Sequence, residues 1–185
     1  MNDADKELLL KLARESIETY FSGKKPDVSH AKKFSEKQGV FVSLHDKRGK
    51  LRGCIGYPHA THQVYIAIVE AARSAAFGDN RFEKLKQEEL EDISIEISIL
   101  TKPTLIEVSH YNEYTKKIIL GQDGLIVDNP QGSGLLLPQV AVENNFNIQN
   151  YLNCVCQKAG LSFNAWRDNA TKLYKFQAEV FSEKK

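Results

Sequence analysis

The sequence feature that most constrains the fold is a strict two-residue alternation between Ile93 and Ile99. Isoleucine occupies positions 93, 95, 97 and 99, and the residues between them are Ser94, Glu96 and Ser98. Successive side chains of a strand point to opposite faces of its sheet. The pattern therefore predicts a strand with one buried apolar face and one polar face.

Apolar residues at helical spacing predict three principal helices. One is expected over 3–21, and another is capped by Thr61 and runs to about Phe77. The second carries a stripe of alanines, which allows close packing against a sheet. A third helix is expected over 148–159, because Gly160 is a favourable residue just past a helix end.

Two further strands joined by a tight turn are predicted over 40–57. A four-residue loop at 46–49 would divide their side chains into two faces. One face then holds Val40, Val42, Leu44, Leu51, Gly53 and Ile55, and the other holds Phe41, Ser43, Arg52 and Cys54. A three-residue loop with Gly49 in a bulge would shift the register by one and place Cys54 beside Val42. We favour the four-residue loop.

The remaining strands complete the prediction of the fold class. A second hairpin is expected where 118–120 and 125–128 flank a GQDG turn, and a last strand over 174–180. Strands thus arrive as hairpins separated by helices, without strict strand–helix repetition. This order predicts an α+β fold with a largely antiparallel sheet and flanking helices. A length of 185 residues favours one domain over 1–185 whose core needs no disulfide or metal.

Charge and cysteine content narrow the classes of function. Twenty-five Lys and Arg against 24 Asp and Glu leave a net charge of +1, so no global field attracts nucleic acid. No apolar run approaches the roughly 18 residues of a membrane helix, and the first residues are acidic where a signal peptide is basic. We therefore expect a soluble cytoplasmic protein. Three cysteines without a CxxC pair predict reduced thiols and no zinc ribbon.

Cys54 is the leading candidate for a reactive group. Gly53 and Gly56 lie on either side of it, and glycine inside a strand costs stability unless a ligand or another backbone comes close. Both glycines are therefore candidate ligand-binding positions. Arg52 on the same strand face would favour the thiolate and bind an anion. The alternative is that Cys54 is a small buried residue and that the glycines make room for the alanine-rich helix.

A catalytic cysteine usually needs a base, and three histidines are close in the sequence. His59 and His62 are candidate catalytic residues, as is His45. Two histidines three apart at a helix entrance are usually solvated, so we expect no metal site there. Cys154 and Cys156 point about 200° apart on a helix and cannot readily bind one metal together.

Asp79 and Arg81 follow the alanine-rich helix and are further candidate ligand-binding residues. Their structural alternative is an ion-pair network with Glu70 around the helix exit, with little effect on stability.

Residues 51–56, with the sequence LRGCIG, resemble the signature of the AMMECR domain family. The resemblance continues through AAFGDNRF, through GLLLPQVA at 134–141, and through KAGL followed by Trp166. It covers nearly the whole chain and suggests the type called AmmeMemoRadiSam system protein A. One departure is Asp123, because many relatives have a histidine before the glycine at this point. A role of that histidine does not carry over to this chain.

The family resemblance implies an α+β fold of two unequal lobes with a cleft between them. We expect the smaller lobe to lie within 104–147. The resemblance implies no established reaction and no cofactor. It suggests partners, since bacterial and archaeal relatives are often encoded beside Memo-like and radical-SAM proteins.

The sequence supports two hypotheses of function. The first is a cytoplasmic enzyme, or a component of one, whose interlobe cleft binds a small anionic molecule, with Cys54 as the reactive thiol and Arg52 as the partner of the anion. The second is a non-catalytic adaptor in which 51–56 is a structural strand and the partner is another protein. Nucleic-acid binding ranks last, because basic residues would have to converge despite the nearly neutral total charge.

Overall fold

The chain forms two compact units. The structure is a computed structural model, and it describes residues 1–183. The first unit contains residues 1–100 together with the segment from Glu179 onward, and the second contains 101–178. The range 104–147, in which we expect the smaller lobe, lies inside the second unit, which extends further along the sequence.

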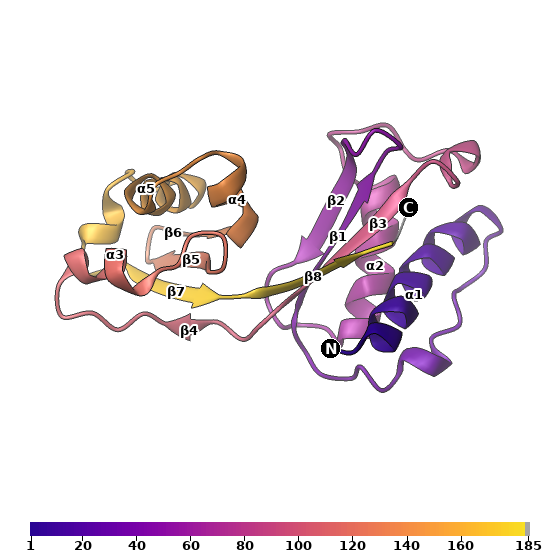
Figure 1. Cartoon of the computed structure of the whole chain (residues 1–185), viewed down its shortest axis with the longest axis horizontal. Coiled ribbons are helices and arrows are strands. Elements are labelled where there is room, and N and C mark those ends of the chain that lie inside the picture. Colours follow the sequence, from indigo (N-terminus) through magenta and orange to yellow (C-terminus); the bar gives the residue numbers. More distant parts are fainter. Residues whose placement is uncertain (184–185) are drawn as a thin grey trace. The chain divides into compact units, whose positions relative to one another are not determined.

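The first unit is a four-stranded sheet covered by two helices (Figure 1). Its elements are α1 (Asp3–Phe21), η1 (Ser29–Ala31), β1 (Gly39–His45), β2 (Leu51–Tyr57), α2 (Val64–Phe77), η2 (Gln87–Glu89), β3 (Ser94–Leu100) and β8 (Ala178–Ser182), where η denotes a short 3-10 helix. The strand order is β2-β1-β3-β8, and β1 runs antiparallel to both β2 and β3. Helix α2 packs on β1 and β2, and α1 packs on α2 and β3.

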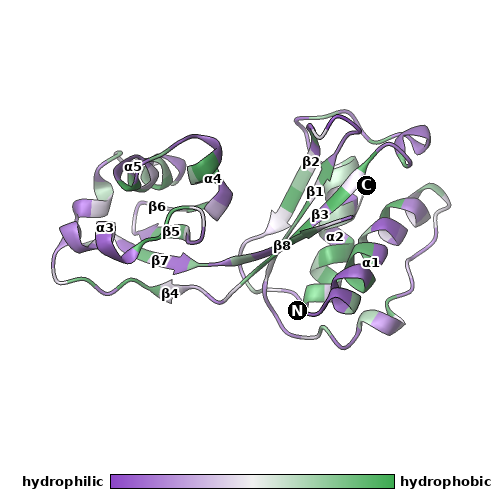
Figure 2. Ribbon diagram, viewed as in Figure 1, coloured by the Kyte–Doolittle hydropathy of each residue, from purple (hydrophilic) through white to green (hydrophobic). Residues whose placement is uncertain are grey.

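The alternation of isoleucines is confirmed as the buried face of β3. Val42 pairs with Ile97 across the β1–β3 register, and both side chains are fully buried. Alanines of α2, among them Ala71 and Ala75, are buried in the same core. Small side chains allow the helix axis to approach the sheet closely, as the alanine stripe predicts. Apolar residues line the facing sides of α2 and the strands (Figure 2).

The loop of the β1–β2 hairpin is the three-residue one, so the four-residue loop that we favoured is wrong. Asp46 N–H donates to Lys50 O at 2.8 Å, which makes these two residues the last pair before the turn. Gly49 has a φ of +76°, in the left-handed region that glycine adopts without strain. The Asp46 carboxylate accepts the Arg48 and Lys50 N–H groups and closes the turn.

A bulge nevertheless restores most of the predicted faces. His45 pairs with Leu51, whereas Leu44 pairs with Gly53, so Arg52 is an extra residue in β2. From Gly53 onward the side chains of β2 lie on the faces that the four-residue loop predicts. Leu51 lies before the bulge, shares the face of His45, and is 41% exposed.

Two helices of the first unit agree with the sequence, apart from one boundary. Helix α1 has the predicted bounds, with the Asn2 side chain accepting Asp5 N–H at 2.8 Å. Helix α2 begins at Val64, so Thr61 is not its N-cap. The Thr61 hydroxyl contacts His62 Nδ1 at 2.8 Å instead, and Gln63 occupies the cap position.

The second unit contains a second four-stranded sheet, with the order β4-β7-β5-β6. Its elements are β4 (Thr104–Leu105), η3 (Tyr111–Glu113), α3 (Tyr114–Lys117), β5 (Gly124–Asn129), β6 (Gly132–Leu136), α4 (Pro138–Glu143), α5 (Ile148–Lys158), η4 (Ala165–Arg167) and β7 (Lys172–Phe176). The strand pairs β4–β7, β5–β7 and β5–β6 are antiparallel. Helix α5 packs on β5 and β6.

The predicted hairpin around the GQDG turn is wrong, because β5 pairs with β6 instead. Ile119 N–H donates to Asp123 Oδ2 at 2.9 Å, and Gly121 has a φ of +79°. These features fold the segment before β5 into a turn rather than a strand.

The predicted last strand is divided between β7 and β8. The interruption lies at Gln177, whose N–H donates to the Thr101 hydroxyl while its carbonyl accepts Thr101 N–H. The fold class itself is α+β with antiparallel strand pairing, as the sequence predicts.

Candidate functional site

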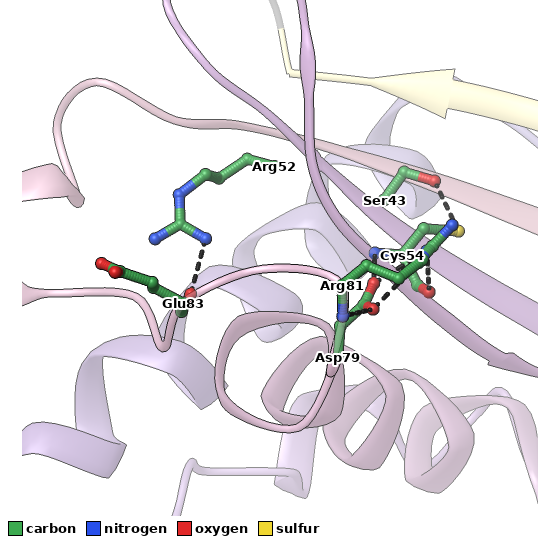
Figure 3. A network of polar contacts seen from close by, with 6 residues as sticks. All are labelled: Ser43, Arg52, Cys54, Asp79, Arg81 and Glu83. Atoms are coloured by element: carbon green, nitrogen blue, oxygen red, sulfur yellow. Dashed lines mark hydrogen bonds and ion pairs between the residues drawn. The ribbon is translucent and has the colours of Figure 1, made fainter.

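Cys54 lies on β2, which is the first strand of its sheet and therefore an edge strand. The register places Cys54 opposite Ser43 of β1. The Ser43 hydroxyl donates to Cys54 Sγ at 3.2 Å (Figure 3). The Cys54 side chain is half-buried and lies on the sheet face opposite to the core residues Val42 and Leu44. The interpretation of Cys54 as a sealed core residue is therefore wrong.

A carboxylate and a guanidinium hold the main chain of Cys54 (Figure 3). Cys54 N–H donates to Asp79 Oδ2 at 2.9 Å, and Arg81 Nη2 donates to the Cys54 carbonyl at 3.1 Å. Both main-chain groups thus bond away from β1. Cys54 and Ser43 consequently form the non-hydrogen-bonded type of antiparallel pair, in which the side chains lie closest. This explains how the Ser43 hydroxyl reaches the sulfur.

Asp79 and Arg81 form a close ion pair at the end of α2. Arg81 Nη2 lies 2.8 Å from Asp79 Oδ2, and Arg81 Nε lies 3.0 Å from Asp79 Oδ1. Asp79 is only 7% exposed. The hydrogen bonds from Arg81 hold the pKa of Asp79 far below its usual range, although burial acts in the opposite direction. Asp79 is therefore ionised at neutral pH.

Arg81 keeps an open side toward solvent. Its side chain is 60% exposed, and within residues 1–183 its Nη1 makes no hydrogen bond. Hydrogen bonding to Asp79 raises the pKa of Arg81, and a thiolate at Cys54 acts in the same direction through its charge. Because Arg81 Nη2 also donates to the Cys54 carbonyl, the guanidinium lies beside Cys54 (Figure 3). The site places an anchored cation with a free donor beside a partly exposed thiol.

Arg52 is not the partner of the Cys54 thiol, which corrects the expectation from the sequence. Its Nε and Nη2 donate to both oxygens of Glu89 at 2.9 and 3.0 Å, and its Nη1 donates to the Glu83 carbonyl at 2.8 Å. Because Arg52 is the extra residue of the bulge, its side chain does not point the same way as that of Cys54. The two side chains diverge in Figure 3. Hydrogen bonds from Arg52 lower the pKa of Glu89. The guanidinium is occupied within the chain.

At Gly53 and Gly56, the space that a side chain would take is filled by neighbouring parts of the chain. A Cβ atom at Gly53 would lie 2.1 Å from the Ala75 carbonyl oxygen of α2. A Cβ at Gly56 would lie 2.4 Å from the Phe41 ring. At Gly53, the close approach is that of the alanine-rich helix. A ligand-binding role for either glycine stays a prediction.

Among residues 1–183, no candidate base forms a hydrogen bond with the thiol. His62 lies 3.9 Å from Glu70 and contacts Thr61, while the His59 side chain is exposed. His45 shares the sheet face of Ser43, and its Nε2 is buried without a hydrogen-bond partner among the described residues. Glu70 is therefore paired with His62 and is not part of the Asp79–Arg81 network.

Within residues 1–183, no group of three or more His, Cys, Asp or Glu side chains is arranged to hold a metal ion. Over the same part of the chain, no helix combines the length and apolar character needed to cross a membrane.

The sequence names Asp79 and Arg81 as candidates, but it does not indicate which residues pair with one another in the candidate site. Asp79 is 25 residues from Cys54, and Glu89 is 37 residues from Arg52. Asp79 lies in the turn after α2 and Glu89 ends the 3-10 helix η2, and carboxylates most often face solvent. The available signal was the strand register, which places Ser43 on the same face as Cys54.

These features define a two-unit α+β protein in which the edge strand of one sheet carries a partly exposed cysteine whose main chain is bound by an ion pair. The family model AMMECR1 matches residues 10–181. The chain therefore belongs to the AMMECR1 family.

Relatives with similar sequences are known from several archaea. A protein of Methanothermobacter thermautotrophicus is 45% identical over 183 residues, covering 95% of this chain and 92% of its own length. Protein MJ0810 of Methanocaldococcus jannaschii is 45% identical over 176 residues, covering 94% of this chain and 88% of its own. The crystal structure of the uncharacterized protein PH0010 from Pyrococcus horikoshii is 41% identical and has a TM-score of 0.89, covering all of this chain and 94% of its own.

Proposed function

We propose that this protein is a cytoplasmic enzyme, or a component of one, that binds a small anionic molecule at Arg81, with Cys54 as the reactive thiol. The observation that carries the proposal is the anchored Arg81 guanidinium with its free Nη1 beside the partly exposed sulfur. The proposed site consists of residues of the first unit alone. The interlobe cleft and the Memo-like or radical-SAM partners remain predictions from the family resemblance.

The arrangement around Arg81 suits an anion for a physical reason. Asp79 fixes the guanidinium through Nε and Nη2, so the side chain loses little further conformational freedom when Nη1 binds a ligand. A carboxylate or phosphate oxygen can accept from Nη1, and such charge-assisted hydrogen bonds are stronger than neutral ones. The site is thus organised before a ligand arrives.

The surroundings of the sulfur support its role as a nucleophile. The sulfur is the nucleophilic atom of cysteine, and at Cys54 it is partly exposed. The Ser43 hydroxyl donates to this sulfur, and the Arg81 guanidinium binds the carbonyl of the same residue. A ligand held at Nη1 would bring its electrophilic atom close to Sγ.

The alternative function, a non-catalytic interaction module, also has an observation in its favour. Arg52 is bound by Glu89, other parts of the chain fill the space beside Gly53 and Gly56, and no histidine of the described residues forms a hydrogen bond with the thiol. On this view β2 is a structural strand and the exposed Arg81 contacts another protein. The reactivity of Cys54 separates the two functions.

The test compares two alkylating reagents at one thiol. Iodoacetate and iodoacetamide form the same type of carbon–sulfur bond, but only iodoacetate is an anion. The ratio of their rates at Cys54 is independent of the thiolate fraction, because both reagents require the thiolate. Relative to the same ratio at Cys154, which serves as the internal reference, we expect an excess of about fivefold at Cys54. Peptide mass spectrometry of the whole protein measures both sites.

The Arg81→Gln variant should reduce the ratio at Cys54 to that at Cys154. Arg48→Gln is the matched control, because Arg48 is an exposed arginine of the nearby hairpin loop. This control should keep the wild-type ratio. Equal ratios at Cys54 and Cys154 in the wild type would exclude an anion site beside the thiol. A thiol that neither reagent labels would favour the interaction module.

A further inference from the structure

The first unit contains a groove of about 1180 Å³, whose lining residues are distinct from those of the Cys54 site. One wall is the outer side of α1 from Asp3 to Glu18. These positions span about 22 Å at the rise of an α-helix. The other wall is formed by Leu90–Ser94, before and at the start of β3, and by Phe181–Glu183 at the end of β8.

The walls of the groove are held in place by one arginine of α1. Arg14 Nε and Nη2 donate to the two Glu183 oxygens at 2.6 and 2.5 Å. The same guanidinium donates to the Leu90 and Ile93 carbonyls at 2.9 and 3.0 Å. Glu183 also accepts Ile95 N–H at 2.9 Å. Because α1, the segment before β3 and the end of β8 are all bound to this pair, the groove exists without a ligand.

The groove combines apolar residues with an excess of carboxylates. Leu10, Leu90 and Phe181 supply apolar surface. Seven acidic and four basic side chains line it, which leaves a charge of −3 in a chain whose total is +1. Two of the basic side chains are already paired with acids of the groove, Arg14 with Glu183 and Lys47 with Asp92.

Two carboxylates on the α1 wall are open to a ligand. Glu7 and Glu18 are eleven positions apart, about three turns, and so lie on the same side of the helix. Neither forms a hydrogen bond or an ion pair with another residue in the range 1–183. Arg14 lies between them in the sequence and feels the charge of Glu18, but its donors are engaged by Glu183 and by the Leu90 and Ile93 carbonyls, so it forms no hydrogen bond with either carboxylate.

We propose that this groove binds a short basic segment of a partner protein, in which Lys or Arg alternates with aliphatic or aromatic residues. The volume exceeds the range of about 300–1,000 Å³ of typical small-molecule sites, which favours a peptide over a metabolite. A length of about 22 Å accommodates about seven residues of extended chain. Basic side chains would meet Glu7 and Glu18, and the alternate side chains would contact the apolar residues. This proposal is independent of the function proposed for Cys54.

The probe is a fluorescently labelled peptide of about seven residues, capped at both ends, in which Lys alternates with Leu. Binding to the whole protein is followed by fluorescence anisotropy. Two reference peptides replace either every Leu by Ser or every Lys by Glu. We expect the Lys/Leu peptide to bind most tightly and its affinity to fall as salt rises from about 50 to 300 mM, because exposed charges are screened.

The double variant Glu7→Gln/Glu18→Gln should weaken binding about 5- to 10-fold, as expected for two exposed charge pairs. The matched control is Asp128→Asn/Glu143→Gln, which removes two exposed carboxylates of the second unit. It should bind as the wild type does. Equal loss in both double variants, equal binding of the Lys/Ser and Lys/Leu peptides, or no binding of the Lys/Leu peptide would each overturn the proposal.

Discussion

The Asp79 side chain joins strand β2 to the turn after α2 through three donor groups. Its carboxylate accepts the N–H of Cys54 on β2, the N–H of Arg81 in the turn after α2, and the Arg81 guanidinium. All of these donors lose their partner together if the carboxylate is removed. Unpaired donors in a buried position cost more than the hydrogen bonds themselves contribute. Asp79 is thus a residue of the candidate site that also stabilises the fold.

Asp79→Asn should lower the free energy of unfolding by about 1.5–3 kcal/mol at pH 7, because a charge-assisted network loses its charge. Since the pKa of Asp79 is depressed in the folded state, its contribution is complete above the unfolded value of about 3.9 and is lost as the pH falls further. The difference between the wild type and the variant should therefore be constant above about pH 5 and shrink below about pH 4. Urea unfolding across this range measures it.

The matched control for this experiment is Asp128→Asn, which changes an exposed aspartate of β5. We expect little change in its stability at any of these pH values, because surface charges contribute little. A difference between wild type and Asp79→Asn that is the same at pH 3 and pH 7 would show that the ionised carboxylate is not the stabilising group.

Gly53→Ala should lower the free energy of unfolding by at least about 2 kcal/mol, because the new Cβ would overlap the Ala75 carbonyl. That oxygen belongs to the backbone of α2, so the whole helix would have to shift. Thermal or urea unfolding of the variant measures the loss.

Gly78→Ala is the control for Gly53→Ala. A Cβ at Gly78 meets its nearest neighbour, the Ser74 carbonyl oxygen, at 3.2 Å, and the change in either direction should stay below about 1 kcal/mol. Similar losses in the two variants would mean that close packing of α2 is not the reason for glycine at position 53.

Residue pairs that are close in the sequence were more predictable than distant ones. The alternation along the chain placed Ser43 and Cys54 on one face, because strand geometry fixes the direction of each side chain. It could not indicate that Arg81, rather than Arg52, is the cation beside the sulfur. That outcome depends on an extra residue in β2 and on a carboxylate 25 positions away.

Helix α5 is attached to the strands of the second unit through Tyr151. The Tyr151 ring is fully buried, and its hydroxyl lies 3.1–3.2 Å from the carbonyls of Asp123, Leu136 and Leu137. Leu136 ends β6, and Asp123 precedes β5. The hydroxyl has a single proton, which it shares among these carbonyls at the ends of two strands.

Tyr151→Phe should lower the free energy of unfolding by about 1–3 kcal/mol, because it removes the donor but leaves the carbonyls buried. Tyr114→Phe is the control, since Tyr114 is also buried and its hydroxyl makes no hydrogen bond with the described residues. Urea unfolding should show a clearly smaller change for the control. Equal effects would indicate that Tyr151 acts through its ring alone.

Periodic elements were predictable to within a few residues, and the connections between them were not. Helix α1 and strand β3 follow directly from apolar spacing, because burial of one side is their main source of stability. The start of α2 was misplaced because the Thr61 hydroxyl bonds to His62 rather than to the helix. The segment 118–120 resembles a strand but turns, since Asp123 captures Ile119 N–H. Such contacts belong to side chains in loops and leave no period in the sequence.

At the scale of the molecule, the second unit is an insertion in the sequence of the first. The chain leaves the first unit after Leu100 and returns to it at Glu179, where β8 completes the first sheet. Length and composition indicated one domain. Neither property shows where the chain leaves one unit and later re-enters it. The transition between the two units is marked by the break between β7 and β8 at Gln177. The apolar alternation of the sequence continues through this break and so does not reveal it.

The ion pair that occupies the main chain of Cys54 also limits how this protein can associate with itself. An uncovered edge strand has unpaired N–H and carbonyl groups that can pair with a strand of another copy, and repetition of that pairing produces aggregates. At Cys54, in the middle of β2, the N–H and the carbonyl that an added strand would need are already bound by Asp79 and Arg81. Such a strand would have to separate a carboxylate from a guanidinium before forming its first two bonds. Asp79 and Arg81 thereby disfavour the addition of a strand from another copy at this point of β2.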